Sequence, residues 1–308
     1  MNQLNSPVVF IVFNRPEPTR RVFAAIAAAR PSHLLIIADA PRADREGERQ
    51  RCEEVMKIVS NVDWPCKVET NIATENMGCR RRVKSGLDWA FSLVEEAIIL
   101  EDDCLPDPSF FPYCSELLER YRNYGQIGLI SGFNPLQDSF PFPYSYYFSK
   151  LVLIWGWATW RRTWQMYDDT MTSWPRVKED GLLRSMWRQP KPYQQWTGIF
   201  DKMYTGEGPD AWSYNLIYSS WTRNWLNVVP SRNLIQNIGF GPDATHTTKA
   251  DRGFKVRAQS LGSPIIHPPA IIDWPEYAEG FQHRFYTPSF LGRAWRKFWF
   301  LMSPDTSE

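Results

Sequence analysis

The sequence predicts an α/β fold, with a mostly parallel central sheet covered by helices on both faces and an irregular, aromatic-rich second half. First, short apolar runs alternate with amphipathic helical patterns, joined by short connections, through about the first 130 residues. Second, residues 8–13 and 97–100 are apolar throughout, as expected of parallel strands that are covered on both faces. Third, regular patterns weaken after Gly132, where Pro, Trp and Tyr become frequent.

Each expected element follows from its residue pattern. Short runs rich in β-branched and apolar residues are expected to be strands: 8–13, 33–38, 66–70, 97–100, 127–130 and 226–229. Longer segments with apolar residues three and four apart are expected to be helices: 18–29, 45–60, 78–94, 108–121 and 211–221. The glycine-containing residues 237–248 are expected to form a loop.

Charge and cysteine usage argue against several classes of protein. The 308 residues include 35 basic and 34 acidic side chains, so the basic excess of a general nucleic-acid binder is missing. The five cysteines form no Cys-x-x-Cys pair, which argues against a disulfide framework or structural zinc site and favours a reducing compartment. No signal peptide and no apolar run of about 20 residues is visible, so we expect a cytoplasmic protein.

Three consecutive carboxylates follow the apolar run 97–100. Glu101, Asp102 and Asp103 come where this expected strand leaves the core. Adjacent negative charges repel one another unless a positive charge joins them. A divalent cation, Mn²⁺ or Mg²⁺, is one such charge, and it could also hold a diphosphate. The alternative is a solvated acidic turn.

Other polar residues follow neighbouring strands of the predicted sheet. Asn14-Arg15 follows residues 8–13, and Asp39 follows residues 33–38. Because ligands of parallel sheets bind at the carboxyl ends of strands, these residues and the acid triplet are expected to line one crevice. No Gly-x-Gly-x-x-Gly or Gly-x-x-x-x-Gly-Lys motif occurs after the first strand, which argues against a dehydrogenase and a P-loop NTPase.

Taken together, these motifs resemble those of GT-A nucleotide-sugar glycosyltransferases, notably N-acetylglucosaminyltransferase-like and bacterial family 2-like enzymes. The resemblance covers the first 130 residues by pattern and pieces as far as about residue 248. It is carried by Phe13-Asn14-Arg15-Pro16, Asp39, Asn76-Met77-Gly78, Glu101-Asp102-Asp103 and Pro209-Asp210. It implies a single GT-A-like domain: residues 1–132 as a Rossmann-like nucleotide-sugar-binding half, 133–280 as the acceptor-binding half, and 281–308 as a basic, aromatic C-terminal segment.

The resemblance also implies roles for individual residues. Asp103 would be the direct metal ligand, and Glu101 and Asp102 would contact the ribose or the donor sugar. Asp39 would face the nucleobase or ribose. The remaining donor-binding residues would be Phe13, Asn14, Arg15 and Asn76. Many family 2 enzymes carry Asp-x-Asp where this chain has Glu-Asp-Asp, so the identity of the direct ligand stays open.

Glycosyl transfer needs a stabilised leaving group and a base for the acceptor hydroxyl. Arg80 and Lys84, near the start of a helix, are candidates for diphosphate binding, and the alternative is a solvated basic face. Asp210 is the candidate base, with Glu207 in reserve and Asp168 or Asp169 as weaker choices. Asp210 could instead be the N-cap of the following helix.

Two further residues and the C-terminus complete the expected site. Trp157 lies in a Trp-rich segment that would shape the donor and acceptor pocket in the GT-A interpretation, and the alternative is a core strand. His246 is a candidate metal ligand by the same resemblance, or a surface histidine. Residues 290–302 mix aromatic and basic side chains, which is typical of a helix that contacts the inner face of the plasma membrane or that packs on its own domain.

We therefore predict a metal-dependent, inverting hexosyl- or N-acetylhexosaminyltransferase. Its donor would be a nucleotide diphosphate sugar, more specifically a UDP-sugar. Its acceptor would be a glycan or lipid-linked glycan in bacterial surface polysaccharide synthesis. Two alternatives remain: a non-catalytic carbohydrate-binding protein that uses the aromatic residues, and a sugar-1-phosphate nucleotidyltransferase.

Overall fold

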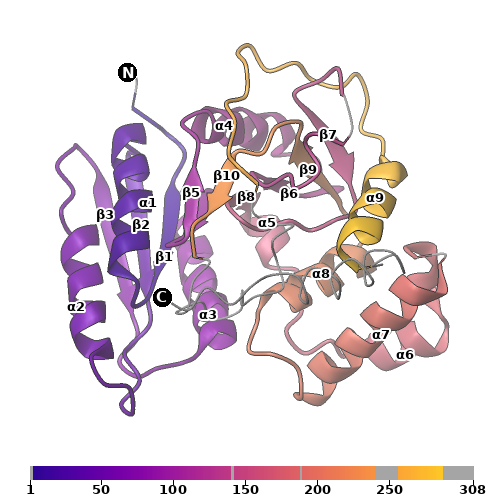
Figure 1. The fold of residues 1–308 in the computed structure, drawn as a ribbon, viewed down its shortest axis with the longest axis horizontal. Coiled ribbons are helices and arrows are strands. Elements are labelled where there is room, and N and C mark those ends of the chain that lie inside the picture. Colours follow the sequence, from indigo (N-terminus) through magenta and orange to yellow (C-terminus); the bar gives the residue numbers. More distant parts are fainter. Residues whose placement is uncertain (1–2, 140–141, 188, 240–255, 287–308) are drawn as a thin grey trace, which may run out of the picture.

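An eight-stranded mixed sheet crosses the molecule in the order β3-β2-β1-β4-β8-β6-β9-β7 (Figure 1). The computed structural model describes residues 3–139, 142–187, 189–239 and 256–286. The strands of this sheet are β1 (Val8–Val12), β2 (His33–Ala38), β3 (Lys67–Ile72), β4 (Glu96–Glu101), β6 (Ile127–Ser131), β7 (Tyr146–Ser149), β8 (Trp157–Trp160) and β9 (Leu226–Pro230). A separate two-stranded sheet pairs β5 (Cys104–Pro106) with β10 (Ile235–Asn237).

Helices follow most of the strands in the first half and dominate the second. They are α1 (Pro16–Ala29), α2 (Glu48–Val59), α3 (Cys79–Leu93), α4 (Phe110–Tyr121), α5 (Arg161–Trp164), α6 (Trp174–Glu179), the 3₁₀ helix η1 (Leu182–Ser185), α7 (Pro190–Thr205), α8 (Ser213–Thr222) and α9 (Pro275–Tyr286). Among the helices that the structure describes, none is both long and apolar enough to span a bilayer.

The four strands β3, β2, β1 and β4 are parallel and form the regular half of the sheet. Val9 of β1 lies between Leu35 of β2 and Ile99 of β4, and all three side chains are fully buried. These apolar runs belong to central strands because both of their faces are covered. The sheet then reverses direction at β8, which is antiparallel to both β4 and β6.

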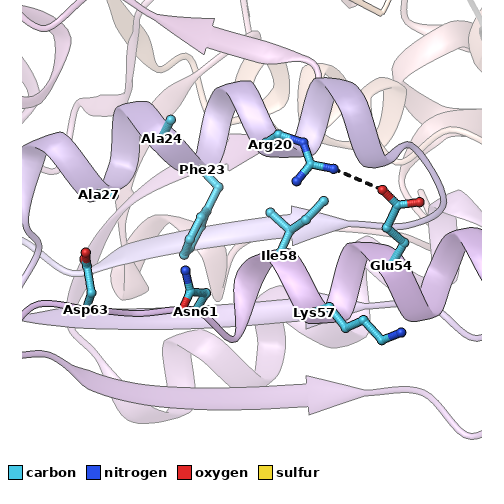
Figure 2. A pocket seen from close by; sticks show the side chains of 9 residues that line it. All are labelled: Arg20, Phe23, Ala24, Ala27, Glu54, Lys57, Ile58, Asn61 and Asp63. Carbon is cyan, nitrogen blue, oxygen red and sulfur yellow. Dashed lines mark hydrogen bonds and ion pairs between the residues drawn. The ribbon is translucent and has the colours of Figure 1, made fainter.

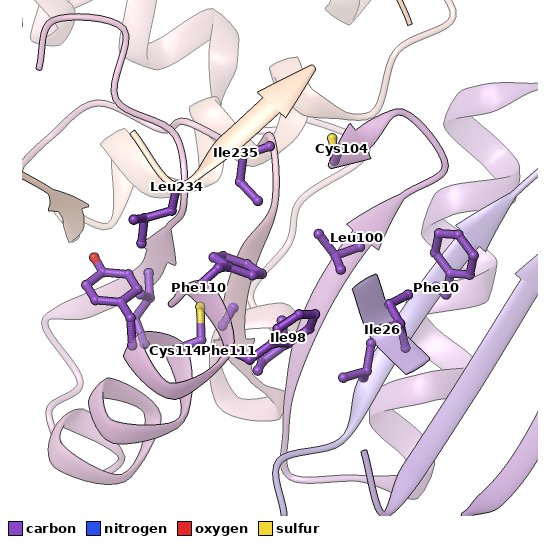
Figure 3. Close-up of a cluster of buried hydrophobic side chains, with 14 of the residues drawn as sticks. Phe10, Ile26, Ile98, Leu100, Cys104, Phe110, Phe111, Cys114, Leu234 and Ile235 are labelled. Atoms are coloured by element: carbon purple, nitrogen blue, oxygen red, sulfur yellow. The ribbon is translucent and has the colours of Figure 1, made fainter. Parts of the chain in front are cut away.

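Two apolar cores cover the two faces of this sheet. One packs α1, α2 and α4 against alternate strand residues such as Phe10 and Ile98 (Figure 3). The other packs α3, α5 and α8 against the intervening residues, such as Val9 and Ile99. The predicted mixed α/β fold, with a mostly parallel sheet and helices on both faces, is therefore confirmed.

A third apolar cluster fills the second half of the chain. It joins α6, α7, α8 and α9 to β7 through aromatic side chains, among them Trp174, Phe200, Tyr218 and Tyr277. These four are almost fully buried. Much of the aromatic richness of the sequence therefore builds a core. Strands β5, β7, β8 and β10 were not among the expected elements, and β10 includes Asn237, where a loop was expected to begin.

Candidate functional site

The carboxyl ends of β1 and β4 meet at the point where the strand order reverses. From β1 the chain builds β2 and β3 on one side, and later returns to place β4 on the other. In open α/β sheets such a switch point leaves a crevice between the connections that leave in opposite directions. Asn14 and Arg15 follow β1 there, and Asp102 and Asp103 follow β4.

Arg15 pairs with two acids of the triplet at once. Its Nη1 donates to Oδ2 of Asp103 at 2.9 Å, and its Nη2 donates to Oδ1 of Asp102. The Arg15 side chain is 22% exposed, against 3% for Asp102 and 14% for Asp103. Burial alone would lower the pKa of Arg15, but the two neighbouring carboxylates raise it further than burial lowers it. The guanidinium therefore supplies the positive charge that the acid triplet requires.

Burial also changes the acids themselves. Removal from water, reinforced by the charge of Asp103, raises the pKa of Glu101 to about 8. Burial raises the pKa of Asp102 as well, against the opposing charge of Arg15. Oδ2 of Asp102 is buried and has no hydrogen-bond partner. This corner of the site therefore holds two acids whose charged forms burial disfavours, together with a buried acceptor oxygen of Asp102.

Asn14 and Phe13 contact a second cluster beside β1, formed by Glu48 and Arg42. The amide of Asn14 donates to Oε1 of Glu48 at 2.8 Å, and Glu48 also accepts the backbone N–H of Arg42 at 2.7 Å. The Arg42 guanidinium lies 5.7 Å from the centre of the Phe13 ring. Hydrogen bonds from Arg42 lower the pKa of the Glu48 carboxyl to about 2. These contacts fix the turn that carries Asn14; a donor contact by Phe13 or Asn14 stays a prediction.

Asp39 and Asn76 are brought together at the end of β2. Asp39 accepts the backbone N–H groups of Met77 at 3.0 Å and Gly78 at 3.1 Å, and its Oδ2 accepts the Asn76 amide at 3.2 Å. Asn76 also donates to the carbonyl of Ala40 at 2.7 Å. The observed role of this pair is to tie the loop before α3 to β2. Contact of either residue with a nucleotide stays a prediction.

Asp210 lies on the N-terminus of α3, far from its own position in the sequence. Its Oδ2 accepts the N–H of Cys79 at 2.7 Å, and its Oδ1 accepts the N–H of Arg80 at 2.9 Å. It does not cap the following helix α8, whose first residue is Ser213 and which has no side-chain cap. The alternative role considered for Asp210, capping, is thus observed, but on a helix 131 residues earlier.

Cys79 is partly buried at the start of α3. Burial raises the pKa of its thiol to about 12, and the next contributions come from the charges of Glu101 and Asp210. Arg15 and Asp39 act on it as well, in opposite directions. The backbone N–H of Cys79 donates to Asp210 at 2.7 Å, and that of the preceding Gly78 donates to Asp39 at the end of β2 at 3.1 Å. Sequence reasoning did not single out Cys79, because a lone cysteine carries no motif.

The other predicted site residues have different surroundings. Arg80 donates to the backbone carbonyl of Asp169 at 2.6 Å, and Lys84 pairs with Asp88 at 2.7 Å. Trp157 is 1% exposed and stacks on Trp212 with ring centres 5.6 Å apart, which is the core-strand position that was its alternative. Direct donor contact by these residues stays a prediction. His246 and residues 290–302 lie outside the described residues, so these predictions are not addressed by the structure.

Arg15 already occupies part of the acid triplet that a divalent cation would bind. Mg²⁺ and similar hard cations take oxygen ligands, commonly one or two carboxylates together with waters and phosphates. One oxygen of Asp102 and one of Asp103 already accept from Arg15. Within residues 3–139, 142–187, 189–239 and 256–286, no group of three or more His, Cys, Asp or Glu side chains is arranged to hold a metal ion. Metal binding at Asp103 therefore stays a prediction from the resemblance.

A pocket of about 560 Å³ lies elsewhere, between α1 and α2 (Figure 2). Phe23 and Ile58 line it, and Arg20 pairs with Glu54 across it at 3.0 Å. None of the predicted site residues lines this pocket. It is therefore separate from the cluster at the strand ends.

No protein-family model matches the sequence, and no curated protein matches it. Among solved structures, a UDP-glucose pyrophosphorylase complexed with UDP-glucose aligns at 11% identity and a TM-score of 0.24, over 46% of this chain and 61% of that one. This chain thus spans less than two thirds of the pyrophosphorylase. Mouse xyloside xylosyltransferase 1, apo form, aligns at 11% identity and a TM-score of 0.29, over 70% of this chain and 81% of that one. Because both TM-scores are below 0.5, neither similarity carries weight for function.

Proposed function

We propose that this protein is a glycosyltransferase that takes its sugar from a nucleotide diphosphate sugar bound at the carboxyl ends of β1 and β4. The observation that carries the proposal is the Arg15 guanidinium held between Asp102 and Asp103 at the switch point of the sheet. A guanidinium has five N–H donors, and two of them are used here. The remaining donors suit the phosphate oxygens of a diphosphate, which arginine binds in a fork geometry.

The acids beside Arg15 suit the neutral part of such a ligand. Oδ2 of Asp102 is a buried acceptor without a donor, and leaving such an atom unpaired costs about 1–3 kcal/mol. A hydroxyl of a ribose or a sugar ring would donate to this pair of acids through Asp103, whose side chain is 14% exposed. Burial disfavours the charged form of Glu101, which would supply a donor of its own when it is protonated. A site that combines spare guanidinium N–H donors with acids for sugar hydroxyls suits a nucleotide sugar better than a bare phosphate.

The finer features of the proposed activity rest on the sequence. They are a UDP-sugar donor, hexosyl or N-acetylhexosaminyl transfer with inversion, and a glycan or lipid-linked acceptor in bacterial surface polysaccharide synthesis. The proposal assigns no general base, because both oxygens of Asp210 accept backbone hydrogen bonds. No step of the proposed reaction is assigned to a metal ion, because Arg15 donates to the carboxylates that would bind one.

Product analysis separates this activity from the two alternatives. The protein would be incubated with UDP-, GDP-, CDP- and dTDP-sugars and a mixture of glycan acceptors, and the released nucleotide identified by chromatography. Transfer releases a nucleoside diphosphate and depends on acceptor, whereas a nucleotidyltransferase releases a nucleoside triphosphate when pyrophosphate is added. Formation of a triphosphate, or sugar binding with no turnover of any donor, would contradict the proposal.

A further inference from the structure

We propose that Asp210 is a positioning residue that fixes the first turn of α3 against the cluster at the strand ends. It would thereby set the affinity of the site for its nucleotide. The structural part of the proposal stands on contacts within the chain. Its consequence for affinity rests on the proposed function. The residue expected from sequence to act as a base is thus assigned a different role.

The first turn of α3 depends on Asp210 for its hydrogen bonds. The leading N–H groups of any helix have no partner within the helix, and a side chain at the N-cap usually accepts one of them. The N-cap of α3 is Gly78, which has no side chain to do so. Asp210 replaces it with both carboxylate oxygens, at 2.7 Å from the N of Cys79 and 2.9 Å from the N of Arg80. Its negative charge also complements the positive end of the helix dipole.

Gly78 leaves room for this carboxylate. Its φ of +75° is a conformation that side chains rarely adopt. A Cβ added at Gly78 would lie 2.6 Å from Oδ2 of Asp210, closer than van der Waals contact permits. Glycine is thus required here for its conformation and for its size. The two residues form a matched pair although they are distant in the sequence.

A second contact, made by Arg80, ties the first turn of α3 to the second half of the chain, as Asp210 does. The Arg80 side chain donates to the carbonyl of Asp169 at 2.6 Å, and this carbonyl also accepts the amide of Asn215 in α8 at 3.1 Å. Next to Asp210, Trp212 is buried and stacks on Trp157 of β8. The segment that follows Asp210 is therefore anchored to β8, and α8 shares the Asp169 carbonyl with Arg80. This anchoring lets Asp210 hold the first turn of α3 in place.

A displaced first turn would disturb the proposed ligand site. Cys79, the first residue of α3, donates its N–H to Asp210. The preceding residue, Gly78, donates to Asp39 at the end of β2. Movement of this turn would displace Asp39 and the end of β2, which pairs with the end of β1 that leads to Arg15. Affinity for the nucleotide would fall without loss of any group that contacts it.

The test compares Asp210→Asn, Gly78→Ala and the double variant with wild type, using Asp44→Asn, an exposed acid outside the site, as control. Amide hydrogen exchange at residues 79, 80 and 82 measures the first turn of α3. We expect exchange about fivefold faster in each single variant, as for a lost cap. The double variant should exchange faster than either single variant, but by less than the product of the two effects, because the two changes share one contact. Asp44→Asn should exchange like wild type.

Nucleotide affinity and turnover provide the second readout. Positioning predicts a dissociation constant for the nucleotide raised about tenfold in both single variants, with turnover at saturation reduced far less. A general base predicts turnover reduced about 10²- to 10⁴-fold in Asp210→Asn at unchanged affinity and unchanged exchange. That pattern, or wild-type exchange in both single variants, would overturn the proposal. If wild type bound no nucleotide, the proposed function would fail, while the exchange measurement would still test the cap.

Discussion

Asp39 and Asp210 together hold four consecutive backbone N–H groups at the start of α3. Asp39, at the end of β2, accepts from residues 77 and 78, and Asp210, in the loop before α8, accepts from residues 79 and 80. Two carboxylates from opposite halves of the chain thus share one helix start. Because helix termini favour anions, this arrangement stabilises the helix and fixes both loops relative to it. The same helix start had been expected from sequence to face a diphosphate.

Removal of Arg15 should destabilise the fold strongly. Arg15→Met leaves the buried Asp102 carboxylate without its counter-charge, which typically costs about 3–5 kcal/mol. Urea unfolding followed by circular dichroism measures the loss. Arg15→Met combined with Asp102→Asn should recover part of it, because the uncompensated charge is then gone. Arg20→Met, which breaks an exposed pair with Glu54, should cost less than about 1 kcal/mol. Equal effects of Arg15→Met and Arg20→Met would contradict this view of the site.

The Glu48 carboxyl should make stability depend on acid pH. Its pKa is about 2 in the folded protein and 4.5 for an ordinary glutamate, so its contribution is complete above about pH 4.5. That contribution is lost as the pH falls from about 4.5 to about 2. Its size is on the order of 2 kcal/mol, because solvent screens the exposed Arg42. Denaturant unfolding between pH 6 and pH 3 should show this slope in wild type and a shallower slope in Glu48→Gln. Identical slopes would show that the pairing does not stabilise the fold.

Mn²⁺ alone should bind poorly to the wild-type protein. Arg15 occupies one oxygen each of Asp102 and Asp103, so a cation would have to displace a guanidinium. We expect a dissociation constant weaker than about 10⁻³ M by electron paramagnetic resonance. Arg15→Gln, which frees the carboxylates, should bind at least about tenfold more tightly. Micromolar binding by wild type that disappears in Asp103→Asn would instead support the metal site inferred from the resemblance.

Substitution of Trp157 should affect stability and not ligand affinity. The ring is buried against Trp212, so Trp157→Leu should cost about 3 kcal/mol through lost packing. Nucleotide affinity, measured on the folded fraction, should stay within twofold of wild type. A large loss of affinity with little loss of stability would restore Trp157 to the donor site.

The regular half of the fold was predictable because its signals are local. Residues 97–100 are apolar throughout, and the parallel strand that they predict lies at the centre of the sheet. Residues 8–13 are apolar throughout as well, and residues 33–38 are apolar after His33; both form parallel strands of the same half of the sheet. Of the later strands, β6 and β9 were predicted, β8 was given only as an alternative, and β7 was missed. Strands β7 and β8 have four residues each, too few to show an alternation. Their aromatic residues, among them Trp157, fit a binding surface and a core equally well.

The site was only partly predictable because its main contacts join distant residues. The strand-end rule identified Arg15 and Asp103 separately, but their pairing spans 88 residues and has no sequence signal. The acid triplet predicted a nearby positive charge, and the structure supplies it from the chain itself. Asp210 was noted for its place before α8, whereas it caps α3, 131 residues earlier. The local feature that accompanies this cap is the positive φ of Gly78. It could not be predicted, because sequence alone shows only that a glycine is present.

The most direct test of the central claim is calorimetric titration of UDP, GDP, CDP and dTDP into wild type, Asp102→Asn and Asp44→Asn, with Mn²⁺ present throughout. Asp44 is an exposed acid that serves as the matched control. We predict that one nucleotide binds wild type and Asp44→Asn equally well and binds Asp102→Asn at least about tenfold more weakly. Failure of every nucleotide to bind the folded wild type, or unchanged binding by Asp102→Asn, would contradict a nucleotide site at the carboxyl ends of β1 and β4.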